Sequence, residues 1–200
     1  VGIKRVVVAT YQAVSGAGGK ALADFAAQRE ALADGRSVRS NLFPHAVALS
    51  PLPAIGEFLP DGSTTEERKL VEESRKILGI PSLRLTATAV RVPVETSHSE
   101  AVNVELEGPL SPDAARALFA RIPGVTVVDD PAGHAYPLAA SSAGRDEIFV
   151  GRIRADASVA HGLDLWIVSD NVRKGAATNA VEIAEILVRD RLLHASRASR

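Results

Sequence analysis

The sequence of 200 residues contains no cysteine and no methionine, and aromatic residues make up only 4% of it. The absence of cysteine excludes disulfides, thiolate metal sites and thiol nucleophiles from this stretch of chain. Because aromatic residues are scarce, the core must be built from Ala, Val, Leu and Ile. A chain of this length is long enough for one sizeable core or two small ones, and because folding buries roughly 70% of its unfolded surface, it needs no disulfide or metal.

Charge and hydropathy exclude further classes of protein. The net charge of -1 argues against a general nucleic-acid binder, which carries a basic surplus. No run of about 18 apolar residues is present, so we expect no membrane span. Because the chain starts at Val1 and has no methionine, we also expect that an initiator, a processed segment or a whole preceding domain is missing from it.

The order of apolar patterns predicts an α+β fold, with a mixed sheet covered by helices on one face. Strands are expected at 4–10, 83–90, 98–106, 125–128, 147–154 and 163–168, and helices at 20–33, 64–78, 112–121 and from about 173 past 187. Four prolines between residues 36 and 62 predict an irregular excursion.

A glycine-rich turn follows the first strand and includes Ser15 and Gly16. Such a turn before a helix brings backbone amides close to an anion. The spacing is not the G-x-G-x-x-G of dinucleotide-binding proteins. Taken alone, the segment is explained more simply as a turn that needs glycine for its backbone geometry.

Arg91 and His98 flank a segment that Pro93 interrupts. Arginine presents a fork that suits a carboxylate, and histidine serves as an acid or a base near neutral pH. A continuous strand would place these two residues on opposite faces, but the proline permits them to converge. Taken singly, Arg91 is explained by a surface ion pair and His98 by a satisfied position at the end of a strand.

Two further candidates lie at the starts of predicted helices. The helix at 64–78 is expected to bury a stripe of Leu70, Val71, Ser74, Ile77 and Leu78, and Glu66 and Lys69 flank this stripe on one side. Glu66 also fits a capping box that begins at Ser63, with Lys69 as a solvated charge. Asn171 belongs to a polar entry into the last helix, where small residues allow close approach of a planar ligand. Ordinary packing of small residues explains the same pattern.

Taken together and in order, these segments resemble the aspartate-β-semialdehyde dehydrogenase family. The matching segments are Thr10 to Gly18, Glu66 to Lys69, Ser74 to Gly79, Val90 to Val94, His98 to Glu100, Phe149 to Arg154, and Asp170 to Asn179. Seven matches in one collinear pass make a chance similarity very improbable.

The resemblance implies a fold similar to the C-terminal domain of glyceraldehyde-3-phosphate dehydrogenase. Residues 1–190 then form a catalytic and dimerisation domain, and residues 191–200 form a basic tail. The helix from about residue 173 is expected to pack on an N-terminal Rossmann domain, which this sequence lacks. The resemblance also implies a homodimer in the cytoplasm.

The activity implied by the resemblance is NADPH-dependent reduction of L-aspartyl 4-phosphate to L-aspartate 4-semialdehyde, on the route to lysine, threonine and methionine. A cysteine thiolate attacks the acyl phosphate, and hydride then reaches the thioester. The resemblance implies no metal. It assigns the acid/base role to His98, substrate orientation to Gln12, the substrate carboxylate to Arg91, the amino group to Glu66, the phosphate to Lys69, and the nicotinamide end of NADP to Ser15, Gly16 and Asn171.

The family's cysteine precedes the segment of Gln12 and is not part of this chain. We therefore expect a piece of an enzyme that is inactive alone. The alternative is a non-catalytic dimerisation module or a degenerate paralogue of the same fold. Retention of the proposed substrate and acid/base residues favours the enzyme; these are Gln12, Glu66, Lys69, Arg91 and His98. The match around Arg91 and His98 disfavours a related acyl-phosphate reductase with another substrate.

Overall fold

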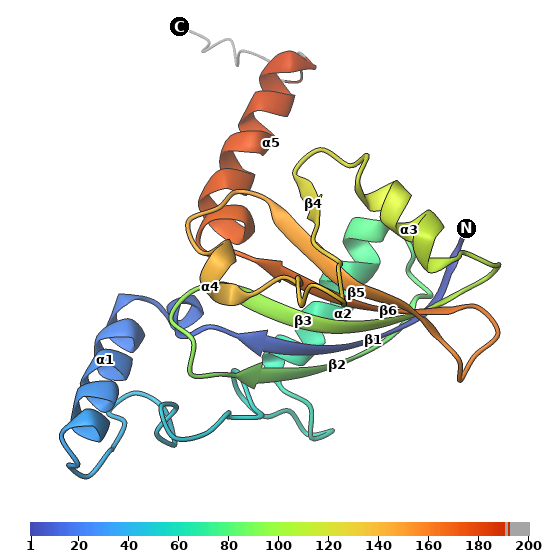
Figure 1. The fold of residues 1–200 in the computed structure, drawn as a ribbon. Coiled ribbons are helices and arrows are strands. Elements are labelled where there is room, and N and C mark those ends of the chain that lie inside the picture. Colours follow the sequence, from blue (N-terminus) through green and yellow to red (C-terminus); the bar gives the residue numbers. More distant parts are fainter. Residues whose placement is uncertain (191, 193–200) are drawn as a thin grey trace, which may run out of the picture.

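A mixed sheet organises the chain in the computed structural model, which describes residues 1–190 and 192 (Figure 1). Within these residues the six strands are β1 (Ile3–Gln12), β2 (Arg84–Arg91), β3 (His98–Leu106), β4 (Val125–Val127), β5 (Ile148–Asp156) and β6 (Gly162–Ser169). Their order in the sheet is β2-β1-β3-β6-β5-β4. β1 pairs with β2 and β4 with β5 in parallel, whereas the other pairs are antiparallel.

Five α-helices accompany the sheet in the part of the chain that the structure describes. They are α1 (Gly19–Ala33), α2 (Thr65–Leu78), α3 (Pro112–Phe119), α4 (Ala139–Ser142) and α5 (Thr178–Arg189). A short 3-10 turn, η1 (Val14–Ala17), precedes α1, and a π-helical turn, η2 (Arg173–Ala177), precedes α5. The predicted strands and long helices are confirmed to within a few residues, and only the one-turn α4 was not predicted.

The main core lies between the sheet and α3. Ala115 of α3 packs with buried residues of β3, β5 and β6, which are Leu106, Val150, Ile153, Leu163 and Leu165. Helix α2 packs on the edge strand β2 and is seen behind the sheet in Figure 1. The α+β fold with helices on one face of a mixed sheet is therefore confirmed.

A second apolar cluster fastens α1 to the irregular excursion between residues 36 and 62. Its buried members are Val14, Ala21, Phe25, Val47 and Leu52. Two residues of the excursion bind neighbouring elements. The backbone N–H of Ala48 donates to the side chain of Gln28 in α1 (3.0 Å), and Leu52 forms an isolated bridge with Arg91 of β2. These contacts hold a segment without regular structure beside the end of the sheet.

The capping box of α2 lies one residue later than expected. Thr64 is the N-cap, its hydroxyl accepts from the backbone of Glu67, and the Glu67 carboxylate accepts from the backbone of Thr64. Glu66 therefore takes no part in the cap, because the helix begins at Thr65 rather than at Thr64. The predicted box from Ser63 to Glu66 was wrong, and Glu66 is free to face another element.

The buried stripe predicted for α2 is shorter than the sequence pattern indicates. Ile77 and Leu78, which we expected to be buried, are 80% and 48% exposed. The helix runs antiparallel to β2, because Glu67 contacts the backbone of Ala89 and Arg75 contacts that of Leu83. The last turn of α2 therefore runs past the first residue of the strand that covers the helix.

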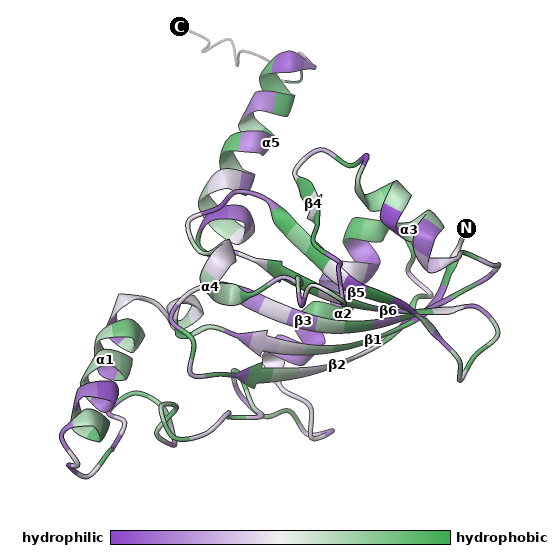
Figure 2. Ribbon diagram, in the orientation of Figure 1, coloured by the Kyte–Doolittle hydropathy of each residue, from purple (hydrophilic) through white to green (hydrophobic). Residues whose placement is uncertain are grey.

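Helix α5 projects away from the sheet (Figure 1), and apolar and polar residues alternate along it (Figure 2). Val181, Ile183, Ile186 and Val188 are 58%, 50%, 42% and 64% exposed. The predicted basic tail lies outside the described residues, apart from Leu192. Among the described residues, no helix is both long and apolar enough to cross a bilayer.

The core gives a direct test of this packing. We expect Ile153→Ala to lower the free energy of unfolding by about 2–5 kcal/mol, because Ile153 is only 2% exposed and its removal leaves a cavity. The matched control is Ile77→Ala on the exposed end of α2, with an expected change within about 0.5 kcal/mol. Urea denaturation of the chain measures both, and equal losses for the two variants would contradict the placement of the core.

Candidate active site

Four strands bring polar side chains to one end of the sheet. Gln12 at the end of β1 pairs with Arg91 at the end of β2, and His98 at the start of β3 pairs with Ser169 at the end of β6. The chain turns back between residues 92 and 97, as the position of Pro93 permitted. The convergence of Arg91 and His98 that the sequence left open is present in the structure, because both side chains lie beside Gly16.

Gly16 in η1 faces both side chains. A Cβ atom built on Gly16 would lie 3.2 Å from Nη1 of Arg91 and 3.3 Å from Nε2 of His98. Any larger residue would therefore press on the guanidinium and the imidazole together. The glycine keeps a small space open in front of the two groups, and this space is the centre of the candidate site.

Arg91 is a buried cation, with only 5% of its surface exposed. Its Nη1 donates to the backbone carbonyl of Ala13. Burial lowers the pKa of the Arg91 guanidinium, and the nearby Glu66 carboxylate opposes this shift. The fork has more N–H groups than this one contact uses, so it can bind an incoming carboxylate.

His98 is held at its Nδ1 atom by the backbone N–H of Ala13, at 3.1 Å. Because a backbone N–H can only donate, Nδ1 accepts, and the proton of the neutral ring lies on Nε2. Burial lowers the pKa of His98 to about 4, with a smaller contribution from Arg91, while Glu66 and Asp170 act in the opposite direction. His98 is therefore neutral near pH 7, and its Nε2–H points toward the space beside Gly16.

Glu66 connects the end of the sheet to α2. Gln12 Nε2 donates to Glu66 Oε1 at 3.2 Å, and Lys69 Nζ lies 3.7 Å from Glu66 Oε2. Lys69 is the outermost of the three, since its side chain is 55% exposed. The structure thus brings Gln12, Glu66 and Lys69 into one polar row beside Arg91.

Ser15 and Asn171 meet next to His98, although they lie 156 residues apart in the sequence. Asn171 Nδ2 donates to the Ser15 hydroxyl at 3.0 Å, and Asn171 Oδ1 accepts from the backbone N–H of Ser97 at 3.0 Å. Together with Gly16, these residues form one wall of the candidate site. All eight predicted site residues therefore gather at the same end of the sheet.

Three further positions were missed from the sequence. They are the backbone of Ala13, which binds both Arg91 and His98, the buried Asp170, and Ser97 with its left-handed φ of 77°. An Asp just before a predicted helix is an N-cap signal, so Asp170 could have been found. Neither the contacts of Ala13 nor the φ of Ser97 has a local sequence signal.

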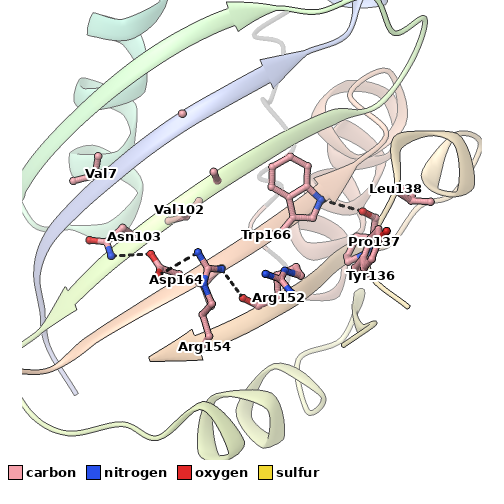
Figure 3. A pocket seen from close by; sticks show the side chains of 13 residues that line it. Val7, Val102, Asn103, Tyr136, Pro137, Leu138, Arg152, Arg154, Asp164 and Trp166 are labelled. Atoms are coloured by element: carbon pink, nitrogen blue, oxygen red, sulfur yellow. Dashed lines mark hydrogen bonds and ion pairs between the residues drawn. The ribbon is translucent and has the colours of Figure 1, made fainter. Parts of the chain in front are cut away.

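The face of the sheet that α2 and α3 do not cover carries a wide hollow of about 610 Å³, which Figure 3 shows from close by. Trp166 lines the end of this hollow near Pro137 and Leu138, with its Nε1 donating to the carbonyl of Pro137 (3.0 Å) and its ring 5.4 Å from that of Tyr11. An ion pair between Arg154 and Asp164 (3.3 Å) lies at the other end. Among the described residues, no group of three or more His, Cys, Asp or Glu side chains could hold a metal ion.

Comparisons with known proteins find relatives over almost the whole chain. Residues 1–174 match the family model described as semialdehyde dehydrogenase, dimerisation domain. An aspartate-semialdehyde dehydrogenase of Legionella pneumophila is 54% identical over 98% of this chain, and one of Aquifex aeolicus is 49% identical over 96%. The chain spans 57% of the length of each of these relatives.

A solved structure shares the fold closely. The crystal structure of aspartate semialdehyde dehydrogenase II from Vibrio cholerae superimposes with a TM-score of 0.91 and 42% identity, over 95% of this chain and 56% of that one. Sequence and fold therefore point the same way. The chain belongs to the aspartate-semialdehyde dehydrogenase family and carries its dimerisation domain.

Proposed function

We propose that this chain supplies the substrate-binding and proton-handling part of an aspartate-semialdehyde dehydrogenase, which reduces L-aspartyl 4-phosphate to L-aspartate 4-semialdehyde. The observation that carries the proposal is the joint placement of Arg91 and His98 around the space beside Gly16. A buried cation and a neutral imidazole beside one small space suit an anionic substrate with a carbonyl that gains negative charge.

The anchors fit the two ends of that substrate. The Arg91 fork binds the α-carboxylate, and Glu66, held by Gln12, receives the amino group. Lys69 lies farther out, where its flexible ammonium group meets the phosphate. Gln12 orients the substrate between these groups. Because each anchor has the opposite charge to the group it meets, the row of side chains fixes the direction of the substrate.

His98 acts on the reacting carbonyl through Nε2. A neutral ring with its proton on Nε2 donates a hydrogen bond to the carbonyl oxygen as that oxygen becomes negative, and thereby stabilises the tetrahedral intermediate. Nδ1 is occupied by the Ala13 N–H, so every proton that His98 gives or takes in its acid/base role passes through Nε2. The depressed pKa keeps the ring neutral throughout the physiological range.

The residues beside His98 fit the nicotinamide end of NADP. Gly16 leaves a gap that a Cβ would fill, and no atom lies within 4 Å of a Cβ built on Gly18, so a flat group can approach the turn. Ser15 and Asn171 would hold the carboxamide, and the cofactor, when bound, supplies the hydride. The preference for NADP and the cytoplasmic location both follow from the family resemblance.

The nucleophile must come from outside this sequence, because the chain contains no cysteine. We therefore propose that the 200 residues alone turn over no aspartyl phosphate. Helix α5, with its exposed apolar residues, would pack on the cofactor-binding domain that completes the enzyme. The alternative function is that of a non-catalytic dimerisation module, and absence of activity in the complete protein would favour it.

The open face of the sheet is the proposed homodimer surface. Trp166, Tyr11 and the half-exposed Leu138 make one part of this face apolar, and the charged side chains of Arg152, Arg154 and Asp164 lie next to this part (Figure 3). Exposed apolar patches with a polar border mark sites of protein association. The description of the family as a dimerisation domain supports the same assignment.

The substrate anchor is tested by Arg91→Lys in the complete gene product. We expect KM for aspartyl phosphate to rise about 10- to 100-fold with a smaller change in kcat, because lysine cannot form the two parallel hydrogen bonds of the arginine fork. Steady-state assays of NADPH oxidation measure this. The control is Arg68→Lys on the exposed side of α2, where Arg68 pairs with Asp61, and an equal rise in KM there would contradict the assignment.

The protonation state of His98 is tested by NMR titration of the chain. We expect a pKa of about 4 and a proton on Nε2 at pH 7. Arg91→Leu should raise the pKa, because it removes a neighbouring positive charge. A pKa at the ordinary value of 6.5, or a proton on Nδ1, would contradict the proposed role.

The low pKa of His98 makes the free energy of unfolding depend on pH. Between about pH 6.5 and 4, unfolded His98 binds a proton and folded His98 does not, so the free energy of unfolding falls as the pH falls through this window. We expect His98→Gln to weaken this dependence. Urea denaturation from pH 7 to pH 4 measures the slope, and identical slopes for both proteins would count against a buried neutral histidine.

The homodimer surface is tested by Leu138→Asp. We expect the dissociation constant of the dimer to rise at least about tenfold, because the interface would bury a carboxylate without a partner. The matched control is Leu49→Asp in the irregular excursion, where the leucine is exposed to a similar extent, 58% against 51%. Sedimentation velocity distinguishes the two, and an unaffected dimer in Leu138→Asp would place the interface elsewhere.

A further inference from the structure

Asp170 is a buried carboxylate to which the proposed chemistry gives no role. It directly follows β6 and is only 3% exposed. Its Oδ1 accepts from the backbone N–H groups of Val172 (2.9 Å) and Arg173 (3.1 Å), and its Oδ2 accepts from that of Gly144 (2.8 Å). Three N–H donors on one carboxylate fix its position and hold the backbone on both sides of Asn171.

Asn171 links the backbone that Asp170 holds to residues of the candidate site. Its side chain binds the Ser15 hydroxyl and the backbone N–H of Ser97, both at 3.0 Å. An amide that bridges two loops keeps both contacts only while its own backbone stays in place. The three hydrogen bonds to Asp170 provide that restraint, since they tie the first turn after β6 to the segment that follows α4.

Ser97 needs such a restraint because its backbone is strained. Its φ of 77° lies in the left-handed region that residues with a Cβ seldom adopt, and its buried hydroxyl has no hydrogen-bond partner in the described part of the chain. Strained residues of this kind persist where the surroundings hold them, and they cluster at functional sites. Ser97 immediately precedes His98, so its conformation sets the direction in which the imidazole leaves the backbone.

We propose that Asp170 is a positioning residue for His98, acting through Asn171 and Ser97. The inference rests on the proposed function, because it concerns the group that handles the proton. By fixing Asn171, Asp170 holds Ser97 in its left-handed conformation and keeps His98 Nδ1 on the Ala13 N–H. The proton of the ring then stays on Nε2, toward the space beside Gly16.

Asp170 also contributes charge to the same place. The groups that act on His98 are Arg91 of β2, Glu66 of α2 and Asp170 after β6. Asp170 therefore opposes the effect of the buried guanidinium on the imidazole, in addition to holding the backbone. A carboxylate suits both tasks, because a neutral acceptor of the same shape would hold the backbone less strongly and carry no charge.

Asp146 provides a matched control, because it anchors the same helical region without facing the site. It pairs with Arg173 (2.7 Å) and accepts from the Thr178 hydroxyl, and its side chain is 48% exposed. A variant at Asp146 loosens the start of the last helix but leaves Asn171 in place. Comparison of Asp170→Asn with Asp146→Asn therefore separates positioning of His98 from general anchoring of the helix.

The test uses NMR of the chain at pH 7 and reads the ¹⁵N shifts of His98 and the hydrogen exchange of the Ser97 amide. In Asp170→Asn, an NH2 group faces the Gly144 N–H. We expect a mixture of Nδ1–H and Nε2–H tautomers and exchange of the Ser97 amide at least about tenfold faster. Asp146→Asn should keep the single Nε2–H tautomer. An unchanged tautomer in Asp170→Asn, or the same mixture in Asp146→Asn, would overturn the proposal.

A second variant covers the case in which Asp170→Asn does not fold. Asn171→Ala removes the link but keeps the three hydrogen bonds of Asp170, and we expect the same mixture of tautomers. A single Nε2–H tautomer in this variant would overturn the path through Asn171.

The kinetic test uses the complete gene product. We expect kcat of Asp170→Asn to fall about tenfold with KM within about twofold, because the substrate anchors stay in place. A rise in KM with unchanged kcat would overturn the positioning role. If the unchanged complete protein has no turnover, the proposed function fails, while the tautomer result still decides the role of Asp170.

Discussion

The backbone of Ala13 holds the two groups on which the site depends. Its carbonyl accepts from Arg91, and its N–H donates to His98. Ala13 is fully buried directly after β1, the strand that pairs with β2 on one side and β3 on the other. Because β1 contacts both strands, one peptide segment fixes a residue at the end of β2 and another at the start of β3. The distance between the guanidinium and the imidazole therefore follows from the pairing of the sheet.

The proximity of Arg91 also influences the protonation state of His98. A buried guanidinium next to a half-buried imidazole favours the neutral ring of His98, while the carboxylates of Glu66 and Asp170 act in the opposite direction. The neutral ring keeps its proton on the atom that faces the open space. The same cation that would anchor a carboxylate thus helps to keep the neighbouring ring of His98 neutral.

Much of the fold and of the site could be predicted from the sequence, because it depends on patterns among residues that are close together in the chain. The alternation along β3 and the strand at β1 were readable from periodicity, and the interruption at Pro93 allowed Arg91 and His98 to meet. The predicted register of the α2 cap was wrong by one residue, since Ser63 and Thr64 are both good N-cap residues and only tertiary contacts of Glu67 with β2 select between them. Ile77 and Leu78 were misplaced because a periodic stripe does not reveal where the covering strand ends.

By itself, the sequence determined the order of strands and helices, the family, and the set of polar residues around Arg91 and His98. The tertiary structure alone decided the partner of His98 Nδ1, the strained backbone of Ser97 and the backbone contacts of the Asp170 carboxylate. The physical reason is distance along the chain. The hydrogen bonds of His98 with Ala13 and of Asn171 with Ser15 span 85 and 156 residues. A local pattern encodes which face a side chain occupies, whereas the atom it meets depends on how the whole sheet pairs.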